Sequence, residues 1–393
     1  MALQINENKC CGCFACLNIC PVNAIYKKME EGFEFPIIDL EKCINCKRCE
    51  QVCPIESDMH NISNARAYIC KSLDEEIRKN SSSGGVFSEI AKEIISENGV
   101  VYGAAYDKDF HIEHNRVDNI DDLEMLRNSK YVQSRIDQIY EKVIDDLREG
   151  KKVLFSGTPC QIKAVNNLCN ANKIGHDKLF TVSVICHGIL SPNLFELYKI
   201  YLEQKYESKI VSINMREKSI SWHRFCFSVQ FQNGKQYKRM HELDPFFHLF
   251  LSNKYLRKSC YACSWKGINE DSDIILGDAW GYSGGYERND NTGYSLVITT
   301  NDKGEKLINQ ISLFKENWDE KHTKSTHESL YTSASLPKNS PDIFPEIIDK
   351  DHSVIFFKQI KVGNITKLIT YAKLIAEKIN LMNIIRNKPL IRE

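Results

Sequence analysis

The chain has 393 residues, 42% hydrophobic and 26% charged, which is an ordinary globular composition and argues against disorder. Its 52 basic residues balance 52 acidic ones, whereas a general nucleic-acid binder needs a basic excess to displace counterions. No apolar run reaches the roughly 20 residues of a membrane span, and the start, MALQINENKC, lacks the features of a secretory signal. We therefore expect a cytoplasmic protein of two or three domains with no transmembrane segment.

Nine of the sixteen cysteines fall within the first 53 residues. In a reducing cytosol, cysteines serve as metal ligands or catalytic groups more often than as disulfides. A C-x2-C-x2-C-x3-C-P run occurs twice, on Cys10, Cys13, Cys16 and Cys20 and again on Cys43, Cys46, Cys49 and Cys53. In two-cluster ferredoxins the fourth cysteine of each run ligates the other cluster. The pattern predicts one 4Fe–4S cluster on Cys10, Cys13, Cys16 and Cys53, and a second on Cys43, Cys46, Cys49 and Cys20.

Zinc is the other metal that C-x2-C pairs often bind. Two copies of the run with matching prolines nevertheless favour iron–sulfur clusters. Cys11 falls outside the pattern and is interpreted as a bystander thiol. Between the runs, GFEFPIID (32–39) predicts the hairpin that joins the two halves. Residues 1–60 are therefore expected to form an α+β, ferredoxin-like domain.

Beyond a polar link, ARAYIC (65–70) and VVYGAAYD (100–107) predict strands. Between them, N-S-S-S-G-G (80–85) opens the helical pattern VFSEIAKEIISEN (86–98), which Gly99 ends. Free N–H groups and small side chains at such a helix start suit an anion, for example a cofactor phosphate. A plain serine N-cap is the alternative.

Two later strands carry cysteines at their ends. KKVLFSG (151–157) leads into Cys160, and TVSVI (181–185) leads into Cys186. Repetition of strand, loop and helix predicts a parallel sheet with right-handed crossovers, which gathers ligands at its carboxyl edge. With the C-x2-C pair Cys260 and Cys263, four thiolates are enough for a third 4Fe–4S cluster. Zinc and unlinked buried cysteines remain the alternatives, since widely separated ligands leave little local signature.

Several further residues are candidates for chemistry. The strand SDIILG (272–277) ends at Asp278, which could bind a cofactor hydroxyl or cap a helix. The stretch INMREKSISWHRF (213–225) contains Lys218 and His223 and could hold an anionic substrate or close over a cofactor; an exposed turn is the alternative. His187 could deliver a proton or merely orient the loop of Cys186. Lys218, His187 and His223 are the candidate catalytic residues.

The motifs SSSGGVF, SKYVQS, GTPCQI, CHG-x2-SP, C-x2-C and GD-x-WG occur in this order between about Ala65 and Thr300. Together they resemble the beta subunit family of coenzyme F420 hydrogenase and dehydrogenase, which also includes 7-hydroxymethyl chlorophyll a reductase. Members bind FAD beside one 4Fe–4S cluster, and many are fused to a two-cluster ferredoxin module.

The resemblance implies that Cys160, Cys186, Cys260 and Cys263 hold the third cluster. It also implies FAD near Ser82, Ser83, Gly84, Gly85, Lys130, Tyr131, Gln133, Ser134, Thr158 and Gln161. The Lys-, Asn-, Ile- and Glu-rich composition resembles that of a low-GC bacterium, so the substrate need not be the family's deazaflavin.

We expect three regions: the ferredoxin domain (1–60), an α/β domain for FAD and a 4Fe–4S cluster (61–330), and a helical C-terminal extension (331–393). The amphipathic pattern ITKLITYAKLIAEKINLMNIIRNK (365–388) predicts a helix that packs on the body, or docks a partner or membrane surface. The predicted activity is that of an iron–sulfur flavoprotein oxidoreductase acting on a small organic substrate, with a ferredoxin or reductase as redox partner. The alternative is an electron-carrier subunit that has no substrate of its own.

Overall fold

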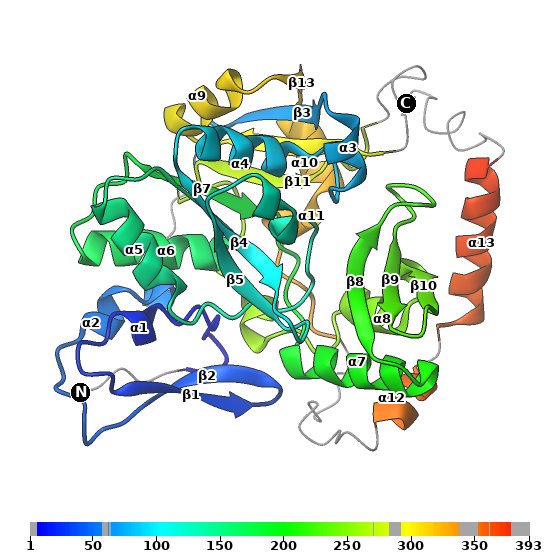
Figure 1. The fold of residues 1–393 in the computed structure, drawn as a ribbon, viewed down its shortest axis with the longest axis horizontal. Coiled ribbons are helices and arrows are strands. Elements are labelled where there is room, and N and C mark those ends of the chain that lie inside the picture. The colour runs from blue at the N-terminus through cyan, green and yellow to red at the C-terminus, as the bar shows by residue number, and fades with distance from the viewer. Residues whose placement is uncertain are drawn as a thin grey trace.

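The computed structural model describes residues 6–56, 62, 64–269, 271–282, 292–337, 353–360 and 362–378. This part of the chain forms a two-stranded, a three-stranded and an eight-stranded sheet with helices around them (Figure 1). The predicted link after Pro54 and the end of the predicted C-terminal helix lie partly outside the described residues.

The N-terminal region contains the predicted hairpin, in the blue part of Figure 1. Strands β1 (Ile25–Glu30) and β2 (Phe33–Ile38) pair antiparallel, and Gly32 at φ 76° makes the turn between them. Each cysteine run enters a short helix, α1 (Ala15–Asn18) or α2 (Arg48–Gln51), and η1 (Pro54–Glu56) follows the second. The two runs therefore have matching local structure.

The eight-stranded sheet has the order β13-β3-β12-β11-β7-β6-β4-β5. The strands are β3 (Arg66–Ser72), β4 (Val100–Tyr106), β5 (Ile112–Val117), β6 (Val153–Gly157), β7 (Leu179–Val184), β11 (Ile274–Asp278), β12 (Ser295–Thr299) and β13 (Leu313–Asn317). The four central strands, β11, β7, β6 and β4, run parallel as predicted. The outer strands pair antiparallel, so the sheet is mixed. β6, β7 and β11 end at the same edge and place their following residues together.

Helices cover both faces of this sheet. On one face, α4 (Val86–Ser96) and α9 (Asp302–Gln310) pack against β4 and β12. On the other, α5 (Ile139–Arg148) and α6 (Pro159–Ala171) pack against β4, β6 and β7. Ala15, Ile19 and Val52 of the N-terminal region share the core of α5 and α6. The N-terminal region is therefore packed directly on the larger domain.

The three-stranded sheet, β8 (Ile210–Glu217), β9 (Cys226–Phe231) and β10 (Gln236–Met240), packs with α7 (Pro192–Tyr206) and α8 (Pro245–Leu251) around an aromatic core. Ser191 caps α7 by accepting from the Leu194 N–H, and a proline follows it, as expected of a helix start. The shorter helices are α3 (Glu75–Lys79), η2 (Asp121–Leu126), η3 (His241–Leu243), η4 (Lys258–Ala262), α10 (Glu320–Thr326) and α11 (Glu328–Tyr331).

Two helices follow residue 352. α12 (Ser353–Gln359) packs on α7, where the ring centroids of Phe357 and Tyr198 lie 4.8 Å apart. α13 (Asn364–Lys378) is the described part of the predicted amphipathic helix, and it leaves Leu368, Tyr371 and Ile375 exposed. None of the helices in the described ranges is long and apolar enough to cross a membrane.

Candidate redox centre

The second predicted ligand set lines one pocket. Cys20 of the first run and Cys43, Cys46 and Cys49 of the second all contribute to its wall, together with apolar side chains such as Ile25 and Ile38. Cys46 is exposed. The exchange of the fourth cysteine between the two runs is therefore compatible with the geometry of this pocket.

The first predicted set is more deeply buried. Cys10, Cys13 and Cys16 are each 8% exposed. Burial raises the pKa of the Cys16 thiol, and the neighbouring charges of Cys10 and Cys53 raise it further. Without a metal these thiols stay protonated, whereas bound iron would supply the positive charge that stabilises their thiolates.

The sulfur spacing bears on the zinc alternative. Four thiolates on one zinc ion lie about 3.8 Å apart, as tetrahedral Zn–S bonds of about 2.3 Å require. Among the described residues, no three cysteine sulfurs lie within 4.8 Å of one another. None of these cysteine sets is therefore gathered as closely as a bound zinc ion would hold it.

The third predicted set comes together at the carboxyl edge of the large sheet. Cys160 lies in the first turn of α6 rather than in a loop, Cys186 follows β7, and Cys260 and Cys263 lie on and just after η4. Burial raises the pKa of Cys186 to about 12, and the charges of Cys160 and Cys263 contribute to the rise. The pKa of Cys260 is raised by burial and by the charges of Cys186 and Cys160. Four cysteines from three separate segments thus lie close enough for their charges to interact.

Nothing in the linear pattern indicated what contacts Cys11. Its thiol lies close to Cys13, in the first ligand set, and to Cys160, in the third, so that both affect its pKa. Because the contact joins distant segments, no local spacing could predict it. The first and third sets are therefore neighbours, while Cys49 of the second set lies near Cys16 and Cys46 is exposed.

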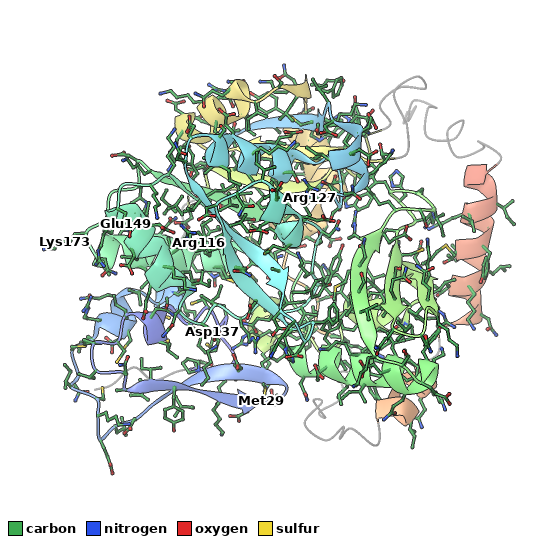
Figure 2. All side chains as sticks on the ribbon, in the orientation of Figure 1. Met29, Arg116, Arg127, Asp137, Glu149 and Lys173 are labelled. Carbon is green, nitrogen blue, oxygen red and sulfur yellow. The ribbon has the colours of Figure 1, made fainter. Side chains whose placement is uncertain are left out.

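The contact between the N-terminal region and the larger domain also includes polar groups. Asn18 Nδ2 donates to the Asp137 carbonyl at 2.9 Å, and Lys27 forms an ion pair with the Asp137 carboxylate. Figure 2 labels Asp137 above the β1–β2 hairpin. These contacts hold the hairpin against the segment that precedes α5.

A buried arginine organises the predicted cofactor residues around Asp278. Arg216 donates through Nη2 to Asp278 Oδ1 at 2.8 Å and to the Ser82 carbonyl at 3.0 Å, and through Nη1 to Tyr131 Oη at 3.0 Å. Trp222 Nε1 donates to the same Asp278 oxygen at 2.8 Å. Three predicted cofactor residues are therefore brought together by Arg216, which lay in the predicted basic and aromatic stretch.

The serine-rich loop before α4 is tightly packed. A Cβ on Gly84 would lie 2.5 Å from the Cys70 carbonyl and 2.7 Å from the Ser295 nitrogen, and Gly85 adopts φ 85°. Ser83 Oγ donates to the Tyr294 carbonyl, and Ser82 Oγ accepts from the Ser129 N–H at 2.8 Å. Glycine is thus required where the loop approaches the strands.

Two lysines expected to face a ligand donate to main-chain carbonyls. Lys130 Nζ lies 2.7 Å from the carbonyls of both Ala104 and Arg127, and burial lowers its pKa to about 7. Lys218 Nζ lies 2.6 Å from the carbonyls of Arg78 and Thr292. Both ammonium groups therefore brace loops around the serine-rich segment.

Thr158, Gln161 and Ser134 form one hydrogen-bonded network. Gln161 accepts from the Thr158 N–H at 2.9 Å, which completes the capping box of α6, and donates to Ser134 Oγ at 3.1 Å. Thr158 Oγ1 lies 3.2 Å from Cys160 Sγ. Gln133 instead donates to the Gly12 carbonyl at 3.0 Å. The predicted cofactor segment 130–134 therefore also contacts the first cysteine run.

Acid is expected to destabilise the protein through His114, whose ring bonds Ser134 Oγ and the Ser156 carbonyl. Burial lowers the pKa of His114 to about 4, whereas an unfolded histidine titrates near 6.5. Between these values only the unfolded chain binds the proton, so the free energy of unfolding falls as the pH drops, by about 3 kcal/mol at pH 4. Thermal unfolding between pH 7 and pH 5 should be less pH-dependent for His114→Phe than for the wild type. If the unfolding temperatures of the variant and the wild type change equally between pH 7 and pH 5, the predicted role of His114 is wrong.

The two candidate catalytic histidines have different surroundings. His187 bonds Ser329 Oγ at 3.1 Å and Asn253 Oδ1 at 2.5 Å, and burial lowers its pKa. Both ring nitrogens are engaged, which favours orientation of the loop over proton delivery. His223 stacks near Trp222 and Trp280, with ring centroids 4.6 and 5.5 Å away.

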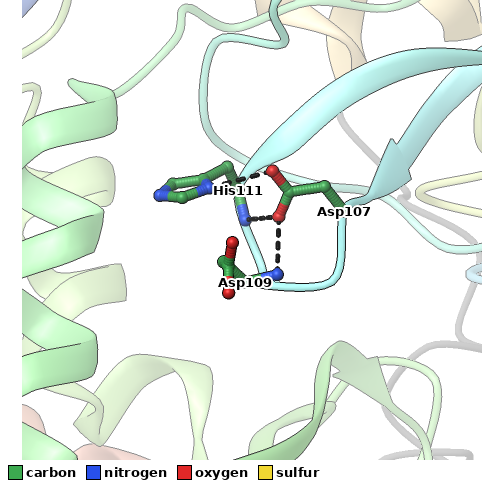
Figure 3. A group of neighbouring side chains, drawn as sticks. All are labelled: Asp107, Asp109 and His111. Atoms are coloured by element: carbon green, nitrogen blue, oxygen red, sulfur yellow. Dashed lines mark hydrogen bonds and ion pairs between the residues drawn. The ribbon is translucent and has the colours of Figure 1, made fainter.

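A separate group, Asp107, Asp109 and His111, has the residue types of a metal site (Figure 3). The Asp107 carboxylate accepts from the backbone N–H groups of Asp109 and His111 at 2.9 and 2.8 Å, and from Arg135 Nη2 at 2.8 Å. These bonds are those of a turn between β4 and β5, and they account for the arrangement without a metal ion.

Comparison with known families confirms the predicted resemblance. Residues 9–57 match the 4Fe–4S dicluster domain, and residues 150–316 match the C terminus of the coenzyme F420 hydrogenase/dehydrogenase beta subunit. The second match begins after the SSSGGVF and SKYVQS motifs, so these lie outside the matched region. The matched domains identify an iron–sulfur electron-transfer protein with a domain from an oxidoreductase family.

Among solved structures, the chain is similar to one from the F420-reducing [NiFe] hydrogenase complex of Methanosarcina barkeri, studied by xenon derivatization. The identity is 17% and the TM-score 0.44, over 77% of this chain and 91% of the other. Comparison with curated protein sequences finds no significant match.

Proposed function

From a 4Fe–4S dicluster domain joined to a domain of the F420 hydrogenase/dehydrogenase beta subunit family, we propose an iron–sulfur flavoprotein oxidoreductase. It passes electrons between 4Fe–4S clusters and FAD, and it reduces or oxidises a small organic substrate. FAD would supply the two-electron chemistry, while the protein positions it and excludes competing reactions.

The observation that carries this proposal is the arrangement of the three cysteine sets. Cys46 of the second set is exposed, the first set is buried, and Cys11 joins the first set to Cys160 of the third. The sets thus form a series that runs from the surface of the N-terminal region to the carboxyl edge of the large sheet. Such a series suits electron transfer between an external redox partner and a cofactor at that edge.

The residues around the sheet edge fit a flavin nucleotide. The α4 N-terminus follows Gly85, an N-cap whose side chain supplies no hydrogen bond, and the positive end of the helix dipole there favours a phosphate. Arg216 Nε is buried and has no hydrogen-bond partner among the described residues, so a polar group beside it would be stabilised. We propose that Ser82, Ser83, Tyr131, Ser134, Thr158, Gln161 and Asp278 complete the site, with Lys130 and Lys218 bracing it.

Metal and sulfide analysis tests the proposed centres. An anaerobically purified chain should contain about twelve iron atoms and twelve acid-labile sulfides, as three four-iron clusters require, together with one extractable FAD. An iron content near eight would remove the third cluster, and zinc in its place would restore the alternative left open by the C-x2-C pair.

A carrier subunit is the second candidate, and the exposed surface near the second set favours it. Leu40 is 73% exposed and Ile44 is 60% exposed beside Cys46, as expected where another protein docks. The dithionite-reduced protein distinguishes the two. An enzyme should be reoxidised by a small two-electron acceptor such as a deazaflavin or a nicotinamide, whereas a carrier subunit should be reoxidised only by a protein.

A further inference from the structure

Arg257 is buried between the N-terminal region and the larger domain, and its side chain is directed at the first cysteine run. It is 0% exposed. Nε donates to the Cys10 carbonyl at 2.7 Å, and Nη2 lies 3.1 Å from the Glu34 carbonyl and 3.8 Å from Cys10 Sγ. Nη1 donates to Gln133 Oε1 at 2.8 Å. The guanidinium is thus held on every side by polar contacts.

The acceptors described for Arg257 are two main-chain carbonyls, an amide oxygen and a cysteine sulfur, and none of them is a carboxylate. The rings of Phe33 and Phe35 lie 5.3 and 4.3 Å from its Cζ. A fully buried cation is costly unless a negative charge balances it. A 4Fe–4S cluster with four thiolate ligands carries net negative charge, and Cys10 would bring that charge to the guanidinium.

The backbone of Arg257 belongs to the third cysteine set. The Cys260 N–H donates to the Arg257 carbonyl at 2.8 Å, and the Arg257 N–H donates to the Ile189 carbonyl at 3.1 Å. One residue therefore links a ligand of the first set, through its side chain, to the loop of the third.

The first cysteine run has a glycine where Arg257 meets it. A Cβ on Gly12 would lie 2.4 Å from Gln133 Nε2 and 2.7 Å from Arg257 Cζ, and Gly12 adopts φ 65°. The run between Cys10 and Cys13 is thus shaped to accept the guanidinium at close range.

We propose that Arg257 is a positioning residue for electron transfer between the first and third centres. Its charge balances the first 4Fe–4S cluster and raises the reduction potential of that cluster. The inference rests on the proposed cluster on Cys10, Cys13, Cys16 and Cys53, and adds a residue that sets its potential. Reduction adds one electron, here from dithionite, and so one negative charge, which a fixed cation nearby stabilises.

An EPR-monitored redox titration of the full-length holoprotein tests this, with iron counted on each sample. The first-cluster signal is the one that Cys16→Ala removes. In Arg257→Gln the equilibrium constant for reduction of the first cluster should fall on the order of tenfold. For a one-electron step this corresponds to a reduction potential about 59 mV more negative. The other signals should stay in place. Arg257→Lys, which keeps the charge, should restore most of the potential.

Lys258→Gln is the matched control, because Lys258 is the next residue and also reaches the N-terminal region, at Glu31, but through a partly exposed ion pair of 2.7 Å. It should leave the first-cluster potential unchanged. If fully loaded Arg257→Gln gives the same potential as this control, the inference is wrong, although the proposed function stands.

If Arg257→Gln fails to load iron, Arg257→Lys decides, because it keeps the charge but loses the guanidinium bond to Gln133 Oε1. A first-cluster potential close to that of the wild type would support the role of the Arg257 charge. A negative shift as large as about 59 mV in spite of the retained charge would overturn it. If instead the wild-type protein contains only about eight iron atoms per chain and lacks the first cluster, the proposed function is wrong.

Discussion

Replacing Cys160 with serine is expected to reduce the iron content from about twelve to about eight atoms per chain, because one of three four-iron clusters loses a ligand. The clusters on the two N-terminal runs should still assemble, since none of their predicted ligands is changed. FAD should still bind, because Gln161 keeps its bonds to Thr158 and Ser134. Stopped-flow measurement should show much slower flavin reduction by dithionite-reduced N-terminal clusters, with iron counted on the same sample.

Cys169→Ala is the matched control for this experiment. Cys169 lies on the same helix, α6, and is fully buried in an apolar core. The control should keep all its iron and reduce flavin at the normal rate. The thiol of Cys11 could replace the lost ligand, so Cys160→Ser is also made together with Cys11→Ala. Full iron and normal flavin reduction in that double variant would exclude Cys160 as a ligand.

Replacing Asp278 with alanine is expected to destabilise the protein by about 3–5 kcal/mol, since it leaves a buried arginine without its counter-charge. The Arg216 side chain is 2% exposed, and its Nη2 lies 2.8 Å from Asp278 Oδ1. The same change removes the acceptor for Trp222 Nε1. The melting temperature should fall, and the amount of FAD extracted per chain should fall with it, because Arg216 also holds Ser82 and Tyr131.

Asp118→Ala provides the comparison for the Asp278 change. Asp118 pairs with Arg116 at 2.7 Å, but its side chain is 55% exposed, so water can replace the lost carboxylate. The melting temperature and FAD content of this variant should match the wild type. If Asp278→Ala behaves like Asp118→Ala, Asp278 is neither the required counter-charge for Arg216 nor part of the flavin site.

The spacing of neighbouring residues was sufficient to predict the features that depend on local interactions. The two cysteine runs, the turn and strand within 32–39 and the strands that lead to Cys160 and Cys186 were all predicted from neighbouring residues. Each depends on hydrogen bonds or ligands within a few residues, so the sequence pattern carries the information directly. The dicluster domain at 9–57 could be predicted on this basis alone.

Only the tertiary structure determined which residues from distant segments come into contact. Tertiary packing, not any spacing, brings Cys186 near Cys260 of η4, and the packing of the N-terminal region on α6 brings Cys11 near Cys160. It also directs Lys130 and Lys218 at main-chain carbonyls, although their sequence context favoured a ligand.

Arg257 had no motif around it, and only the packing of the N-terminal region on α5 and α6 makes it a buried charge. The energetics of burial depend on what surrounds a group in three dimensions. A linear sequence contains the residue, and the fold alone determines its neighbours.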